Sequence, residues 1–351
     1  MTKTHSNIIK IISTLFICSL IGLILLLYIL LIPSSNSKST QVLNIPKNSN
    51  VTQIAKILKN KSLIHSTLFF KLTTRLTNKD KKLRAGYFLI PISPNQQQLI
   101  KILSTENGAY SLQKIIIPEG FSITQIATVL ENQSICKKDT FEKFAHKKAK
   151  QEFSSDFNFI KNIPSSITTI EGYLFPNTYF FKKNESLNTI IKTMLIEFEK
   201  KIYIPYQNNI KIKKYKYNFH QLLTLASMIE KESRVITEMP RISSVFYNRL
   251  KKRMRLSSDP TVVYALGKSY KDKVYYKDLK IKSPYNTYRV GGFPPSPIAS
   301  PGKNAFKAAS YPESTSFLFF VAMRNGRHFF SNTYKEHLAF QRQMKRSKKT
   351  K

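Results

Sequence analysis

The sequence is poor in several residue types on which many folds and sites depend. It has no tryptophan, ten glycines and two cysteines among its 351 residues. Cys18 lies in an apolar N-terminal run and Cys136 far beyond it, so we expect neither an internal disulfide nor a cysteine metal cluster. The six histidines show no paired spacing such as His-x-x-x-His. We therefore predict no metal and no cofactor.

Acidic residues are also scarce, with 20 Asp and Glu against 57 Lys and Arg and a net charge of +37. Taken alone, that excess suggests a nucleic-acid binder or a protein of anionic surfaces. The lysines are spread along the whole chain, however, and richness in Ile, Asn and Lys together is typical of an AT-rich genome. We predict no nucleic-acid partner, although a minor role of the charge in holding the body near anionic lipid stays open.

Residues 11–32 contain no charged side chain and exceed the roughly 20 residues that span a bilayer core. Lys3 and Lys10 precede this run, and positive flanks stay on the cytoplasmic side. The sequence predicts a cytoplasmic N-terminus at 1–10, a single transmembrane helix at 11–32 in the cytoplasmic (inner) membrane, a linker at 33–41 and a body outside the cytoplasm. A cleaved signal peptide is the alternative, but its apolar region would be shorter, about 7–15 residues.

A repeated pattern occupies residues 42–149. Each copy has a short apolar strand that ends in Ile-Pro, a turn, and an amphipathic helix with a leucine on its apolar face. The Ile-Pro pairs lie at 45–46, 90–91 and 117–118, and the leucines are Leu58, Leu103 and Leu130. The sequence therefore predicts three strand–helix repeats.

The segment from Leu222 to Glu232 reads as a mostly apolar helix that carries two acids. At 100° per residue its apolar side chains gather on one face, and Glu230 falls within that face. Apolar surroundings disfavour the charged form of an acid and raise its pKa, as a general acid in sugar chemistry requires. Spacing alone favours a helix-edge glutamate paired with a lysine, and it separates Glu230 from Glu232 only weakly.

Further elements complete an α+β pattern around this helix. We expect a strand at 178–181, a helix at 187–200, a helix that starts at Pro240, and a helix at which Asp259 is the N-cap with Pro260 in the first turn. Phe317 to Ser331 predicts a hairpin, and Asn332 or Thr333 a cap for a final helix.

Five blocks follow one another in this part of the chain. They are Glu171-Gly172-Tyr173-Leu174-Phe175-Pro176-Asn177, Ala226-Ser227-Met228-Ile229-Glu230-Lys231-Glu232, Leu256-Ser257-Ser258-Asp259-Pro260, the loop from Ser283-Pro284-Tyr285-Asn286 to Gly302, and Gly326-Arg327-His328 through to His337. Together, and in this order, they resemble the endolytic murein transglycosylase family. Two positions depart from the family's usual pattern: Ser296 stands where glycine is typical and Leu338 where asparagine is typical.

The resemblance implies a membrane-anchored lyase without a cofactor. Such an enzyme cuts the MurNAc–GlcNAc bond inside nascent peptidoglycan strands without water and leaves a 1,6-anhydro-MurNAc end. It implies that Glu230, the first glutamate of its matching block, is the catalytic acid and base. It also implies a catalytic domain at 160–345, a basic tail at 346–351, and a LysM-like peptidoglycan-binding role for 42–149, for which a spacer is an equal alternative. Termination of glycan elongation, beside peptidoglycan synthases, is the implied role.

The other candidate residues each have a structural alternative. Glu171 is a second acid, a residue that orients the sugar, or a turn residue before Gly172. Asp259 is a base or a helix cap. Tyr285, Asn286 and Tyr288 bind sugar hydroxyl and acetamido groups or fix the loop around Pro284. Two other functions are carried as alternatives: a non-catalytic, membrane-tethered peptidoglycan-binding protein, which the repeats alone would fit, and a membrane-attached nucleic-acid binder, supported only by charge.

Overall fold

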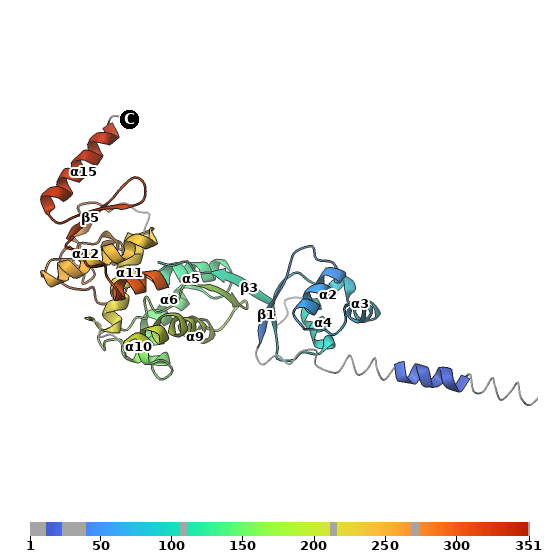
Figure 1. Ribbon diagram of the computed structural model, residues 1–351. Coiled ribbons are helices and arrows are strands. Elements are labelled where there is room, and N and C mark those ends of the chain that lie inside the picture. The colour runs from blue at the N-terminus through green and yellow to red at the C-terminus, as the bar shows by residue number, and fades with distance from the viewer. Residues whose placement is uncertain (1–11, 23–39, 106–110, 211–215, 268–273, 350–351) are drawn as a thin grey trace, which may run out of the picture. The chain divides into compact units, whose positions relative to one another are not determined.

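The computed structural model describes residues 12–22, 40–105, 111–210, 216–267 and 274–349 (Figure 1). Residues 12–22 are helical. Within these described ranges no helix is long and apolar enough to cross a membrane. The predicted transmembrane segment 11–32 extends beyond residues 12–22 on both sides, so half of it lies outside the described residues.

The chain divides into two compact units. The first comprises Met1–Lys114 and Phe180–Lys183, and the second comprises Ile115–Tyr179 and Asn184–Lys351. A four-stranded sheet has the order β1-β2-β3-β4, from β1 (Gln41–Ile45), β2 (Gly86–Ile90), β3 (Ser111–Ile116) and β4 (Thr178–Phe181). The chain passes from one unit to the other within β3 and again within β4. The strand predicted at 178–181 is confirmed.

The first unit is a small strand–helix domain. Its helices are α2 (Val51–Asn60), α3 (Thr67–Leu76) and α4 (Gln96–Ser104), with a 3₁₀ turn at Asp80–Lys82. Strands β1 and β2 pair antiparallel, with Leu43 opposite Phe88, and both side chains are buried. Leu58 and Leu103, the leucines that the repeat pattern singles out, are fully buried in the same core.

The three predicted strand–turn–helix repeats are confirmed and share one turn geometry. Strands β1, β2 and β3 lead to α2, α4 and α5 (Ile123–Asn132). Two residues after each proline the backbone has positive φ, at Asn48 (61°), Ser93 (46°) and Gly120 (76°). Each helix then begins with a reciprocal capping box, formed by Asn50 with Gln53, Asn95 with Gln98, and Ser122 with Gln125. Helix α5 belongs to the second unit, so the region 42–149 runs across both units.

The second unit is mainly helical. Its further elements are α6 (Lys138–Lys147), α7 (Ala149–Phe153), α8 (Asn158–Lys161), α9 (Leu187–Phe198), a π-helical turn (Glu199–Tyr203), α10 (Ile204–Ile210), α11 (Phe219–Glu232), α12 (Met239–Lys251), α13 (Asp259–Ala265), α14 (Lys303–Ser310), β5 (Phe319–Ala322), β6 (His328–Ser331) and α15 (Tyr334–Lys349), with 3₁₀ turns at Ile236–Glu238 and Asp278–Lys280. Together with the four-stranded sheet and the β5–β6 pair, these helices make the chain a mixed α+β structure, as predicted. The helix expected at 187–200 is longer than predicted, since the π-helical turn continues it into α10.

Helix α11 lies at the centre of this unit because it is apolar almost all round. Every side chain from Leu222 to Ile229 is buried, and α11 packs against α12, α13 and α14. Its first turn is closed by a capping box in which Asn218 accepts from the backbone N–H of Gln221. A helix so enclosed holds the side chains at its C-terminal end in fixed positions.

Two sequence expectations concern helix caps. The N-cap of α13 is Ser258 and not Asp259, which is the first helical residue. The Asp259 carboxylate instead accepts a hydrogen bond from the Tyr288 hydroxyl at 2.6 Å, so it is not turned toward the backbone N–H groups. The final helix begins as expected after Thr333, whose hydroxyl accepts from the N–H of Glu336 at 3.2 Å.

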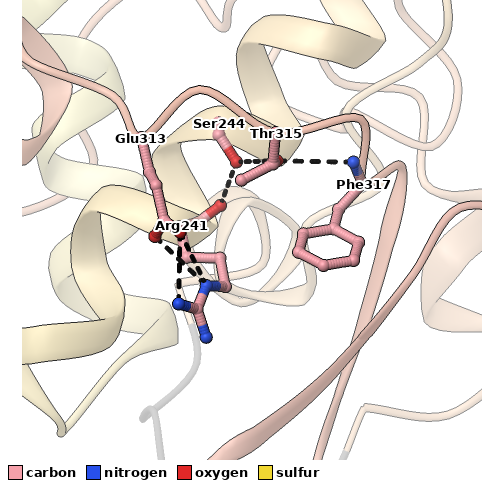
Figure 2. Close-up of polar contacts among 5 residues, drawn as sticks. All are labelled: Arg241, Ser244, Glu313, Thr315 and Phe317. Carbon is pink, nitrogen blue, oxygen red and sulfur yellow. Dashed lines mark hydrogen bonds and ion pairs between the residues drawn. The ribbon is translucent and has the colours of Figure 1, made fainter.

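The extended segment between α14 and β5 is fastened to helix α12 (Figure 2). Arg241 donates from Nε and Nη2 to the carboxylate of Glu313, each at 3.1 Å, and the hydroxyls of Ser244 and Thr315 lie 2.7 Å apart. The Thr315 hydroxyl also accepts from the N–H of Phe317 at 3.4 Å. These contacts fix the start of the predicted hairpin, which the structure confirms as β5 and β6.

Candidate active site

Glu230 lies at the C-terminal end of α11, where the helix emerges from the core. Its side chain is half-buried, and its Oε2 accepts a hydrogen bond from the backbone N–H of Gly302 at 3.0 Å. Burial raises the pKa of Glu230, and the nearby Glu119 adds to this, whereas the Gly302 N–H and Lys231 oppose it. The carboxyl group is therefore biased toward its protonated form while one fixed donor is ready to stabilise the ionised form.

The backbone approaches Glu230 closely at the turn of the third repeat. Gly120 has φ of +76°, and a Cβ there would stand 3.4 Å from Glu230 Cγ. This turn is joined to the loop before α14 by an antiparallel bridge: Gly120 N–H donates to Ser300 O and Ser300 N–H to Phe121 O, both at 2.8 Å. The positive φ at position 120 favours glycine, although Asn48 and Ser93 also have positive φ at this position of the first two repeats.

Glu119 was not among the residues that the sequence singled out. A Cβ on Gly302 would stand 2.7 Å from one carboxylate oxygen of Glu119 and would overlap the other, so this carboxylate rests on the Gly302 backbone. The sequences of the three repeats did contain an indication that Glu119 is special. The third copy has Glu-Gly after its proline, where the first copy has Lys47-Asn48 and the second has Ile92-Ser93.

Glu171 is the most deeply buried acid of the described residues, with 1% of its surface exposed. Its two oxygens accept from the N–H of Ile123 at 3.1 and 3.2 Å, and Oε2 accepts from the Tyr264 hydroxyl at 3.3 Å. Burial raises the pKa of Glu171 to about 8 although these hydrogen bonds oppose the shift. Its neighbour Gly172 has φ of +84°, and a Cβ there would collide with Pro297. Glu171 is thus fixed by hydrogen bonds and, with a pKa of about 8, mostly protonated at pH 7.

A cavity of about 550 Å³ lies beside Glu171 and the residue that follows Glu230. Its polar lining includes Ser122, Gln125, His146, Glu171, Lys231 and Tyr264. Lys231 Nζ donates to the carbonyl of Gly120 at 3.1 Å. Burial lowers the pKa of Lys231, and the negative charges of Glu230 and Glu171 oppose that shift. A cavity of this size with converging donors and acceptors suits a ligand rich in hydroxyl and amide groups.

Glu232 faces a different and larger cavity of about 780 Å³. Its Oε1 accepts from the Ser258 hydroxyl at 2.5 Å, and burial raises the pKa of Glu232 to about 7, with the charge of Asp259 adding to the effect. Arg249 and the β5–β6 hairpin also line this cavity. Neither cavity size nor a raised pKa by itself distinguishes Glu232 from Glu230.

The structure separates the other predicted substrate residues into three settings. Asp259 and Tyr288 hydrogen-bond to each other and line the cavity of Glu232. The ring of Tyr285 packs on Tyr264 at a centroid distance of 4.9 Å, and its hydroxyl lies 2.6 Å from Ser296 Oγ. The Tyr285 side chain is therefore near Glu171.

The side chain of Asn286 holds the loop around Pro284 in place. Its side chain is fully buried and donates to the carbonyls of Leu279 and Ile281, both at 2.9 Å. Of the two alternatives that the sequence left open for Asn286, these bonds favour the fixing of the loop. Gly291 and Gly292, in contrast, have nothing within 4 Å of a built Cβ, so no close packing within the protein requires them. The positive φ of Gly292, 77°, is a sufficient reason for glycine there.

Two histidines in the last matching block are engaged in hydrogen bonds within the protein. His328 Nδ1 lies 3.0 Å from Glu238 Oε2, and His337 Nε2 lies 3.0 Å from Gln341 Nε2. Both side chains line the cavity of Glu232.

Comparison with known proteins adds the following. Residues 43–343 match the family model described as the YceG-like family. The chain is 39% identical over 311 residues to a protein named endolytic murein transglycosylase from Bacillus subtilis (strain 168), with 86% of this chain and 84% of that protein covered. It is 32% identical over 323 residues to a Streptococcus pneumoniae (strain D39) protein of the same name, and spans 58% of that longer relative. A crystal structure of a yceG-like protein from Listeria monocytogenes is 35% identical with a TM-score of 0.58, and the match covers 87% of this chain and all of that one.

Proposed function

The chain belongs to the YceG-like family, and on that premise we propose that it is an endolytic murein transglycosylase, a lyase that cuts peptidoglycan strands internally. The observation that carries the proposal is the setting of Glu230: a half-buried carboxyl group of raised pKa at the end of a rigid helix, with one backbone N–H on its oxygen. The same name belongs to the relatives, one of which aligns with 86% of this chain.

In the proposed reaction Glu230 acts twice. Protonated Glu230 gives its proton to the bridging oxygen as the bond to C1 of the N-acetylmuramyl unit breaks. The ionised carboxylate then takes the proton of the C6 hydroxyl on the same sugar, and that oxygen closes on C1 to give a 1,6-anhydro end. Hydrolysis normally needs a second carboxylate to serve as nucleophile or to activate water. Here one carboxyl group serves both steps, and the Gly302 N–H stabilises its charge between them.

We assign glycan binding to the cavity of about 550 Å³ that adjoins Lys231. Tyr264, Gln125 and Ser122 present hydroxyl and amide groups to it. Glu171, held by the N–H of Ile123, is proposed to orient the sugar and not to transfer a proton, because its hydrogen bonds fix it in place. For Tyr285, contact with Tyr264 and Ser296 supports a role in shaping this cavity.

The cellular setting is part of the same proposal. The uncharged run 11–32 behind Lys3 and Lys10 supports a single-pass anchor in the cytoplasmic membrane with the body outside the cytoplasm. The strand–helix repeats at 42–149 support a LysM-like peptidoglycan-binding role. A lyase so placed would end the elongation of nascent strands and work beside peptidoglycan synthases. A non-catalytic tether is the alternative if no cleavage occurs.

The test is mass analysis of purified glycan strands incubated with the whole protein. Products should end in 1,6-anhydro-MurNAc, about 18 Da lighter than the products of hydrolysis. Glu230→Gln keeps size and shape but has no proton to give, and general acid–base catalysis is typically worth about 10²–10⁴-fold. We expect near-complete loss of cleavage with unchanged circular dichroism and glycan binding. Reducing-end muramic acid as the main product would refute the lytic route, and full activity of Glu230→Gln would refute the site.

A further inference from the structure

The third strand–helix repeat differs from the other two at one turn. In all three copies the residue after the proline is exposed: Lys47, Ile92 and Glu119. In all three the next residue has positive φ. Only the third copy has an acid followed by glycine, and its turn meets Glu230 and Lys231 at the end of α11. The three repeats therefore share the backbone geometry of the turn, and the third repeat differs in having Glu119 and Gly120 there.

The turn holds the backbone next to Glu119 in a fixed place. Gly120 N–H donates to Ser300 O and Ser300 N–H donates to Phe121 O, and these two bonds align the turn with the loop that leads into α14. Lys231 Nζ binds the carbonyl of Gly120 from the other side at 3.1 Å. The Glu119 carboxylate then lies on the backbone of Gly302, at the place a side chain would otherwise fill.

Gly302 links the two acids. Its N–H is 3.0 Å from Glu230 Oε2, while the carboxylate of Glu119 occupies the space beside its Cα. We propose that Glu119 is a positioning residue of the lyase reaction, whose negative charge at Gly302 keeps Glu230 in the acid form that the first proton transfer needs. This inference rests on the proposed function and adds a second carboxylate that acts through Glu230.

The charges that face Glu230 support this assignment. Burial is the main cause of its raised pKa, and the negative charge of Glu119 raises that pKa further. The Gly302 N–H and the Lys231 ammonium lower it, and Lys231 is itself shared with Glu171. Without Glu119, the two groups that favour ionised Glu230 would be opposed by burial alone.

The experiment compares the pH dependence of strand cleavage in wild type and Glu119→Gln, using the full chain in detergent. Loss of the negative charge lowers the pKa of Glu230, so the alkaline limb of kcat/KM moves to lower pH. We expect the ratio of wild-type to variant kcat/KM to rise by at least about threefold between about pH 5 and about pH 8, because on the alkaline limb a lower pKa leaves a smaller fraction of Glu230 protonated. Glu119→Asp keeps the charge and should restore most of the wild-type profile.

Asp139→Asn is the matched control, because Asp139 is an exposed acid of the same unit in the first turn of α6. It removes one negative charge without touching Gly302, and its profile should match wild type. A Glu119→Gln profile that is merely lowered at every pH, with an unmoved limb, would mean a structural role and would overturn the proposal.

A direct titration separates this inference from the proposed function. Glutamate labelled with ¹³C at the carboxyl carbon reports the ionisation of Glu230 by NMR, and the Glu230→Gln variant identifies its signal. The Glu230 midpoint should fall in Glu119→Gln whether or not the protein cleaves glycan. An unchanged midpoint would overturn the role of Glu119, whereas absence of cleavage with a shifted midpoint would count against the lyase assignment alone.

Discussion

Replacement of Glu171 by glutamine should change how the stability of the fold depends on pH. The carboxyl group is fully buried, accepts from the N–H of Ile123 and receives the Tyr264 hydroxyl. Burial raises its pKa from 4.5 to about 8. Glutamine has nearly the shape of the protonated acid and keeps an oxygen for the N–H of Ile123, but it does not ionise.

The sign follows from the direction of the shift. Because the folded-state pKa lies above the unfolded value, folding favours the proton-bound form. The stability contributed by Glu171 is fully present below about pH 4.5 and is lost as the pH rises toward 8. Since a pKa difference of one corresponds to about 1.36 kcal/mol, the loss has an upper limit on the order of 5 kcal/mol. Attraction between ionised Glu171 and the Lys231 ammonium opposes the shift and is already included in the value of about 8.

The assay is urea unfolding of the full chain followed by circular dichroism at several pH values between about 5 and 8. We compare wild type with Glu171→Gln at each pH, so that the titration of every other group cancels. The two proteins should have similar unfolding free energies at about pH 5, and the variant should become the more stable by a few kcal/mol at about pH 8. Asp139→Asn, which alters an exposed acid, should show no such trend.

A difference between wild type and Glu171→Gln that stays constant across this pH range would refute the reasoning. It would mean that Glu171 has an ordinary pKa or is ionised throughout, and that burial does not govern its protonation.

Two further predictions concern the second acid of α11 and the topology. Glu232→Gln should keep cleavage within about threefold of wild type, because Glu232 faces the other cavity and bonds to Ser258; a loss as large as the roughly 10²–10⁴-fold expected of a general acid would transfer the catalytic role to it. An alkaline phosphatase fused after Lys351 should be active, since Lys3 and Lys10 predict a cytoplasmic N-terminus and a body outside the cytoplasm; an inactive phosphatase together with a fluorescent GFP fusion at the same point would contradict this topology.

Local patterns allowed much of the fold to be predicted. The three strand–helix repeats were visible because each carries its own period and its own helix start, which the structure shows as a capping box. The β5–β6 hairpin and the cap of α15 at Thr333 were visible for the same reason. The N-cap at Asp259 was misplaced by one residue because Tyr288, 29 residues away, holds the carboxylate.

The candidate site depends on contacts that no local pattern contains. Glu232 lines the cavity of about 780 Å³, whereas Glu230 accepts a hydrogen bond from the N–H of Gly302, and helical periodicity separates the two acids only weakly. Glu119 meets Gly302 only through the bridge between Phe121 and Ser300, two segments far apart in the sequence. The buried amide of Asn286 likewise has its partners fixed by a loop, not by a periodic element.

Gly302 also bears on how this part of the sequence can change in evolution. The space above its Cα belongs to Glu119, so an alanine at 302 would evict that carboxylate without any substitution at 119. Because the carboxylate is the end of an exposed side chain, a descendant with alanine at 302 accommodates it by turning Glu119 away from Gly302, which carries the negative charge away as well. The contact joins two positions 183 residues apart in the sequence, and a single substitution at either one is enough to remove it.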